Sequence, residues 1–117
     1  MRTLIAVVML LGAALGAGPA QAHAFLDHAS PLVGSTVDAA PHEVSLSFTQ
    51  NLEPSFSTVE VTGPNGARVD VGKAQISGNT MRVGLKAAGS GTYHVHWHAL
   101  SVDTHTTQGS FTFHVGQ

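Results

Sequence analysis

The feature that most constrains the fold of this chain is a series of short segments in which apolar and polar residues alternate. Residues 42–48, 57–62, 81–86, 93–98 and 110–115 show this period of two, which places every second side chain on the same face of a strand. Turn-forming Gly, Pro, Asn and Ser residues separate these segments. No apolar repeat of period 3.6 extends beyond a turn or two. The pattern predicts an all-β protein.

About seven such strands, with turn signals every 8 to 12 residues or so, are typical of an antiparallel immunoglobulin-like sandwich or Greek-key barrel. Two further strands are expected at residues 25–28 and 68–71. The turn Gly63-Pro64-Asn65-Gly66 predicts a hairpin that joins residues 59–61 to residues 68–71. We expect Trp97 to anchor the core and Tyr93, on the same strand, to form a corner hydrogen bond.

Residues 1–22 have the features of a secretory signal. Arg2 supplies a positive start, an apolar run extends from Leu4 to Leu15, and Ala20-Gln21-Ala22 fits the small-x-small cleavage pattern. The run is shorter than the roughly 18 to 20 apolar residues of a membrane span, and an uncleaved N-terminal anchor is the alternative. We therefore expect a cleaved signal peptide, export of the protein, and one mature β domain at residues 23–117.

Composition narrows the chemistry of this mature domain. The chain has no cysteine, so it must depend on its apolar core without disulfides and offers no thiolate ligand. Four Lys and Arg residues against seven Asp and Glu residues give the mature part a formal charge of −3, which argues against nucleic acid and anionic lipid as partners. All eight histidines follow residue 22. Because imidazole is a favoured ligand of zinc, copper and nickel, this excess favours metal binding.

The best metal ligands lie at the end of the segment Tyr93 to His105. Asp103 and His105 are two positions apart, so both side chains can reach one ion from an extended backbone. If the precursor is cut after Ala22, His23 adds its free α-amine and its ring Nδ1. Three nitrogens and one oxygen in a tetragonal plane suit Cu(II). The alternatives are an unstructured terminal histidine, an aspartate that caps the turn, and a solvated surface histidine.

Soft-metal sites are disfavoured by the same composition. The mature part has one methionine, Met81, and its place in an inward-facing pattern predicts core filler instead of a ligand. Because Cu(I) prefers sulfur, we expect reduction to release the ion. A blue-copper electron-transfer site is excluded, since it requires a cysteine.

Three more histidines alternate with the inward residues of segment 93–98. His94, His96 and His98 are therefore expected on one outer face of the strand. They can hold a second, weaker Zn(II) or Cu(II) ion, support the primary ligands, or simply form a polar exposed face. The remaining histidines are isolated in the pattern and are expected at the surface: His28, His42 and His114.

Several motifs together resemble one known family. They are His23-Ala24-Phe25-Leu26 after the signal, the Ser30-Pro31 turn, Pro41 before a Val-x-Leu-x-Phe strand, Gly91-x-Tyr93-x-Val95-x-Trp97, Ser101-x-Asp103-x-His105, and Gly109-Ser110-Phe111-x-Phe113. This set looks like the CopC family of periplasmic copper-binding proteins, and the resemblance covers essentially the whole mature chain. It implies a small immunoglobulin-like Greek-key barrel that binds one Cu(II) ion. The implied ligands are His23, by amine and ring, with Asp103 and His105.

Two departures from the family pattern are visible. Thr104 stands where the family commonly has glycine between the aspartate and the histidine, which can alter the turn but leaves both ligands. The methionine-rich Cu(I) loop of some members is absent from the sequence. The chain thus resembles the members that bind Cu(II) alone.

We therefore expect a non-enzymatic, monomeric periplasmic protein that buffers or delivers Cu(II) in copper homeostasis or resistance. The resemblance implies an inner-membrane copper transporter of the CopD type as a partner.

One alternative is a copper monooxygenase with an N-terminal histidine chelate. Against it, a coordinating Asp103 would complete the equatorial plane, and the short chain leaves little length for a substrate platform. The other alternative, a metal-free immunoglobulin-like interaction domain, is disfavoured by the histidine excess.

Overall fold

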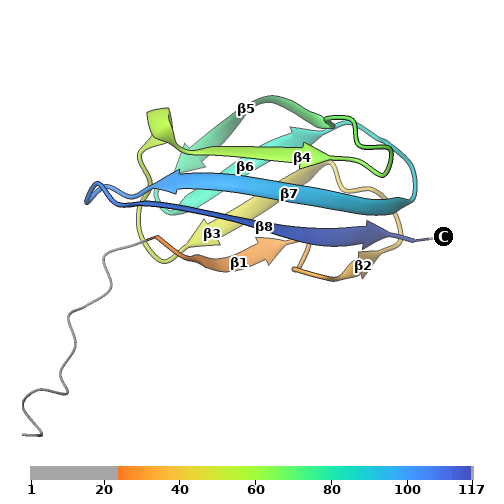
Figure 1. Cartoon of the computed structure of the whole chain (residues 1–117), viewed down its shortest axis with the longest axis horizontal. Helices are drawn as coiled ribbons and strands as arrows, with labels where there is room; N and C mark the ends of the chain where they lie inside the picture. Colours follow the sequence, from red (N-terminus) through yellow and green to blue (C-terminus); the bar gives the residue numbers. More distant parts are fainter. Residues whose placement is uncertain (1–23, 117) are drawn as a thin grey trace, which may run out of the picture.

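The computed structural model describes residues 24–116, so the predicted signal peptide and the predicted ligand His23 lie outside the described residues. The described part forms two four-stranded β-sheets that pack face to face (Figure 1). This confirms the predicted all-β sandwich. Its elements are β1 (Leu26–Ser30), β2 (Thr36–Val37), β3 (Glu43–Phe48), the 3-10 turn η2 (Pro54–Phe56), β4 (Thr58–Thr62), β5 (Asp70–Ser77), β6 (Thr80–Leu85), β7 (Gly91–Leu100) and β8 (Thr106–Val115).

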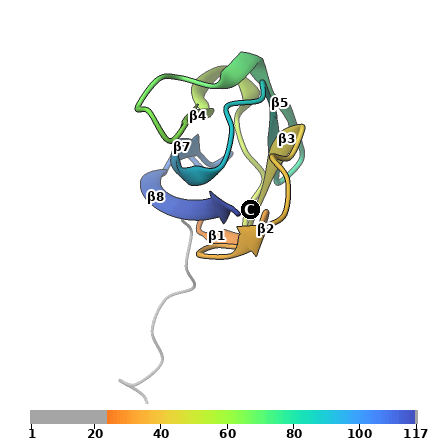
Figure 2. The same ribbon diagram turned by 90° about the vertical axis from the view of Figure 1, so that its right-hand side faces the viewer.

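The chain crosses between the two sheets several times, in the manner of a Greek key. One sheet has the order β1-β3-β6-β5 and the other has the order β2-β8-β7-β4. Neighbouring strands are antiparallel except for the short β2, which runs parallel to β8. Figure 2 shows β4, β7 and β8 on one side of the molecule and β3 and β5 on the other. Chain segments from both ends of the sequence therefore meet across a single core.

The core consists of the inward residues of the alternating segments. Trp97 is only 6% exposed and contacts Phe48 edge to face, with ring centres 5.0 Å apart. Tyr93 donates its hydroxyl to the Gly89 carbonyl at 2.7 Å, so the predicted core anchor and corner hydrogen bond are both confirmed. Other predicted inward residues are buried as well: Val44, Leu46, Val59, Val61, Met81, Val83, Val95, Phe111, Phe113 and Val115.

The prediction of a hairpin across residues 63–66 is wrong, except for a short contact next to the turn. The turn closes, and the Val69 amide donates to the Val61 carbonyl at 2.9 Å. However, β4 pairs with β7 and β5 pairs with β6, so the chain changes sheets here. The Val61 amide donates to the Asp70 carboxylate at 2.9 Å instead of to a backbone carbonyl. A side-chain acceptor thus takes the place of the backbone carbonyl that a hairpin would have offered to Val61.

Two strands differ from the predicted pattern for local reasons. Strand β5 extends from Asp70 to Ser77, well past the predicted end at residue 71, and its pairing with β6 shifts register between Val71 and Gln75. Gly72, with a φ of +72°, lies in this irregular part and interrupts the alternation. Strand β2 was not predicted because two residues are too few to show any alternation.

The close approach of β8 to Trp97 yields a test of the core. Gly109 is the cross-strand partner of Trp97, and a Cβ atom at this position would lie 2.6 Å from the indole ring. We expect Gly109→Ala to lower the free energy of unfolding by about 1–3 kcal/mol, because the buried indole has no room to move. Gly84→Ala is the matched control, since its nearest neighbour would be 3.8 Å away. Equal denaturant midpoints for the two variants would contradict this packing.

Candidate metal-binding site

Asp103 and His105 lie in the turn between β7 and β8. The two strands form ten consecutive residue pairs, so the hairpin holds this turn at one end of the sandwich (Figure 1). The turn is closed by Ser101, which is fully buried and donates its amide to the His105 carbonyl at 3.0 Å. The backbone between the two predicted ligands is therefore fixed by hydrogen bonds.

The structure brings the two predicted side chains together. His105 Nδ1 lies 3.4 Å from Asp103 Oδ1, and the side chains are 50% and 38% exposed. The Ser101 hydroxyl donates to the same carboxylate oxygen. This hydrogen bond, with a smaller contribution from His105, holds the pKa of Asp103 below its usual value. The turn thus presents an ionised carboxylate and an imidazole to solvent, which are the two ligand types expected from the sequence.

Thr104 adopts a backbone conformation that normally belongs to glycine. Its φ is +75°, and a left-handed conformation costs a residue with a Cβ atom roughly 1–2 kcal/mol. The Thr104 amide compensates in part by donating to the Ser101 carbonyl at 2.9 Å. The turn therefore forms with threonine at this position, and Asp103 and His105 lie on either side of it.

The start of the described chain is fixed next to this turn. Ala24 is completely buried, and its carbonyl accepts a hydrogen bond from the Thr107 hydroxyl at 2.6 Å. Phe25 is held by its backbone, because its amide donates to the Thr49 hydroxyl at 3.0 Å and its carbonyl accepts from the Thr49 amide at 2.9 Å. Thr107 is two residues past His105 on β8, so the described part of the chain begins beside the turn that carries the predicted ligands.

Residues 24–116 contain no group of three or more His, Asp or Glu side chains close enough to hold a metal ion. Of the three predicted ligands, the structure brings two together, whereas His23 lies outside the described residues. The complete ligand set therefore stays a prediction.

The other described histidines all keep some exposure to solvent. His94 and His98 are exposed and His96 is half-buried, so the three lie on the outer face of β7 as predicted. His28 and His42 are exposed. His114 is half-buried, and its Nδ1 lies 2.9 Å from the Thr92 hydroxyl on the neighbouring strand.

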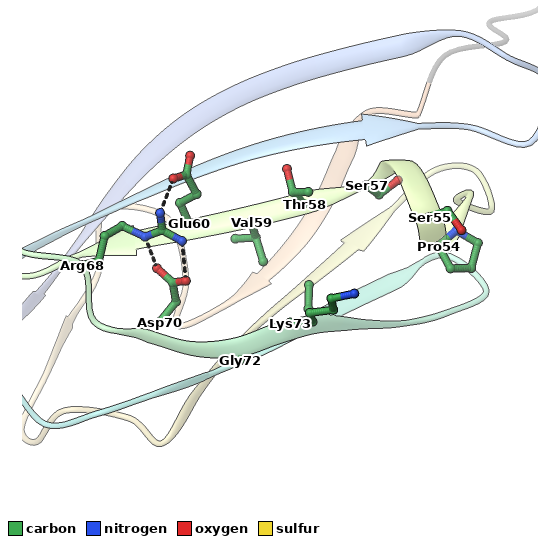
Figure 3. Close-up of a pocket in the computed structure, with 11 residues that line it drawn as sticks. Pro54, Ser55, Ser57, Thr58, Val59, Glu60, Arg68, Asp70, Gly72 and Lys73 are labelled. Carbon is green, nitrogen blue, oxygen red and sulfur yellow. Dashed lines mark hydrogen bonds and ion pairs between the residues drawn. The ribbon is translucent and has the colours of Figure 1, made fainter.

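A pocket of about 480 Å³ opens between β4 and β5, the edge strands of the two sheets (Figure 3). Arg68 crosses it and makes a two-point ion pair with Asp70, with both nitrogen–oxygen distances 2.7 Å, and a third contact with Glu60 at 2.6 Å. Because both acids are paired with one guanidinium, we assign this cluster a structural role. The sequence analysis missed it, although Arg68 and Asp70 are two positions apart.

None of the pocket residues is one of the predicted metal ligands. The pocket and the hairpin turn are therefore separate features of the molecule. In the described range, no helix is both long and apolar enough to cross a membrane.

The fold and the turn together define a class: a small two-sheet β-sandwich that presents a carboxylate and an imidazole on one hairpin. Residues 26–116 match the CopC domain, and the chain belongs to the CopC family. It is 33% identical to copper resistance protein C of Xanthomonas campestris pv. juglandis, over 97% of this chain and 96% of that protein.

Solved structures agree with this assignment. CopC from Methylosinus trichosporium OB3b matches with a TM-score of 0.73 and 30% identity, over 80% of this chain and 93% of that chain. PcoC from Escherichia coli, described as a methionine-rich copper resistance protein, matches with a TM-score of 0.70 and 32% identity, over 81% of this chain and all of that chain. The family resemblance found in the sequence is confirmed.

The Arg68 cluster predicts how stability depends on pH. The hydrogen bonds from Arg68 hold the pKa of Asp70 below its usual value, so the pair stabilises the fold above about pH 4 and is lost as the pH falls through the lowered pKa. We expect Asp70→Asn to cost about 1–2 kcal/mol at pH 7, since Arg68 is partly screened by water, and to cost less in acid.

Urea unfolding of both proteins between pH 7 and pH 2 measures this difference. Asp38→Asn makes the same chemical change at an exposed position and should cost little at any pH. A cost for Asp70→Asn that stays constant down to pH 2 would contradict the ion pair.

Proposed function

We propose that this protein is a periplasmic carrier that binds one Cu(II) ion through His23, Asp103 and His105, and that buffers or delivers copper without turnover. The observation that carries the proposal is the pairing of Asp103 with His105, 3.4 Å apart, beside the anchored backbone of Ala24. We take copper as the metal because relatives in the family are named for copper resistance. The proposal includes cleavage after Ala22, a monomeric state, and a CopD-type membrane protein as the acceptor of the ion.

The anchoring of Ala24 supports a role for His23. Consecutive Cα atoms are 3.8 Å apart, so residue 23 is bound covalently to a residue whose carbonyl is fixed to Thr107. Thr107 lies on the same strand end as His105. Cleavage after Ala22 would leave the proposed N-terminal ligand one residue from this anchored backbone, and an anchored neighbour lowers the entropy lost when a ligand joins a site.

The ionisation of the turn supports metal capture at neutral pH. A ligand must be deprotonated before it binds, and the pKa of Asp103 is lowered by the Ser101 hydroxyl, so no proton competes for this carboxylate. A carboxylate oxygen and imidazole nitrogens, with an amine nitrogen, form a set that Cu(II) accepts in a tetragonal plane.

The lack of accessible sulfur among residues 24–116 supports Cu(II) over Cu(I). The chain has no cysteine, and Met81 is completely buried in the core. Since Cu(I) prefers thioether and thiolate ligands, the described surface offers it little. We accordingly place this protein with the Cu(II)-only members of the family, in contrast to the methionine-rich PcoC.

The first test removes each ligand of the turn. Asp103→Ala and His105→Ala should each raise the Kd for Cu(II) by at least about tenfold and change the EPR spectrum recorded with one equivalent of Cu(II), because each removes a direct ligand. Both side chains are outside the core, so the circular dichroism spectrum should be unchanged. Thr104→Gly alters the same turn but keeps both ligands, and it should bind like the parent. Parent-like binding by both alanine variants would refute the site.

A second test concerns the chain terminus. A protein that begins with Met before His23 has an amide where the mature protein has an amine, and an amide nitrogen is a poor ligand unless it loses its proton. We expect this form to fold normally, to bind Cu(II) more weakly, and to lose the proton release near pH 8 that a free α-amine contributes. Calorimetry in two buffers and EPR compare the forms. Equal affinities with identical spectra would remove the amine from the site.

A further inference from the structure

The outer face of the sheet β2-β8-β7-β4 carries a stripe of imidazoles along its strand β7. His94, His96 and His98 occupy alternate positions, and each points away from the buried face formed by Tyr93, Val95 and Trp97. Their cross-strand partners on β4 and β8 are all polar: Thr58 and Gln108 beside His98, Glu60 and Ser110 beside His96, Thr62 and Thr112 beside His94. No bulky apolar side chain therefore stands among the nearest partners of the stripe.

The geometry points to a second, weaker metal site at His96 and His98, which takes a divalent transition-metal ion such as Cu(II), Ni(II) or Zn(II). The two rings have centres 4.8 Å apart, and their planes make an angle of 83°. Imidazole–metal bonds are about 2.0–2.1 Å long, so two neighbouring rings on one ion have their centres roughly 4.5–5 Å apart. The pair already has the separation that a shared ion requires.

A hydrogen bond fixes one of the two rings for this purpose. His96 Nδ1 lies 2.8 Å from the Ser110 hydroxyl on β8. When Nδ1–H donates to this hydroxyl, the lone pair is left on Nε2, and metal-binding histidines are commonly oriented by such a contact through their other nitrogen. His96 thus has both a second imidazole, His98, and an orienting hydroxyl on the same face of the sheet. No such contacts are found among the described residues for the exposed His28 and His42.

The expected affinity is modest because only two protein ligands are available. Glu60 lies opposite His96, but its carboxylate is held by Arg68 at 2.6 Å. Residues 24–116 also contain no group of three metal-ligating side chains. Water must therefore complete the coordination, and the site should fill only after a site with more protein ligands.

The position of the stripe suggests its use. Strand β7 continues from His98 directly into the turn that carries Asp103 and His105. An ion held loosely on the strand stays near that turn, which raises its local concentration there. This use depends on the proposed Cu(II) function, whereas the existence of the second site does not.

A titration of the mature full-length protein with Cu(II) tests the second site. We expect the first equivalent to give one EPR spectrum and the second equivalent to give a different one, with a Kd at least about tenfold higher. NMR should show that the second equivalent broadens the ring signals of His96 and His98. In His96→Gln/His98→Gln the second equivalent should stay in solution while the first still binds. His28→Gln/His42→Gln removes two exposed histidines as a control and should bind both.

The outcomes separate the two sites. Asp103→Ala/His105→Ala should still bind one ion weakly, with broadening at His96 and His98, and this result supports the stripe whatever happens to the primary site. Parent-like binding of the second equivalent by His96→Gln/His98→Gln would overturn the proposal, as would an equal loss in the control. If the double variant fails to fold, His98→Gln alone decides, because His98 is exposed and should lose the second equivalent without unfolding.

Discussion

The pairing of β7 with β8 is the constraint on which the rest of the structure depends. Its ten residue pairs fix which side chains face inward, and a slip of one residue would send Trp97 to solvent and the neighbouring histidines into the core. The aromatic stack of Tyr93 on Phe113, with ring centres 5.1 Å apart, requires the same register. The end of this hairpin is also the turn that carries Asp103 and His105. Core and candidate site are thus set by a single strand pairing.

The sequence alone predicts much of this arrangement because its signals are local. Alternation over five or more residues identified β3, β4, β6, β7 and β8, and the spacing of Asp103 and His105 placed both on one turn. Features that depend on distant pairings were not predictable in this way. The Gly63–Gly66 turn signal was real, yet the Asp70 side chain took the Val61 amide and the chain changed sheets. The hydrogen bond from the Thr107 hydroxyl to the Ala24 carbonyl joins residues 83 positions apart, and no local sequence pattern predicts it.

The two proposed metal sites can share one strand with the core because successive side chains of a β-strand point to opposite faces. The inward residues of β7 supply packing, while its outward residues and its end supply nitrogen and oxygen ligands. Substitutions on one face therefore leave the other face largely undisturbed. The Ser110 hydroxyl beside His96 and the Ser101 hydroxyl beside Asp103 act alike, since each orients a prospective ligand from a neighbouring position.

The separation of core from ligands bears on how a carrier gives up its ion. In a structural zinc site the ligands hold the fold together, and loss of the metal unfolds the domain. Here the described core is built from apolar residues, and the turn is closed by a hydrogen bond from the Ser101 amide, while Asp103 and His105 remain partly exposed. The free energy of folding therefore does not rest on the ion. Under the proposed function, copper could therefore bind at the turn and leave it without disturbing this core, which is what buffering and delivery require.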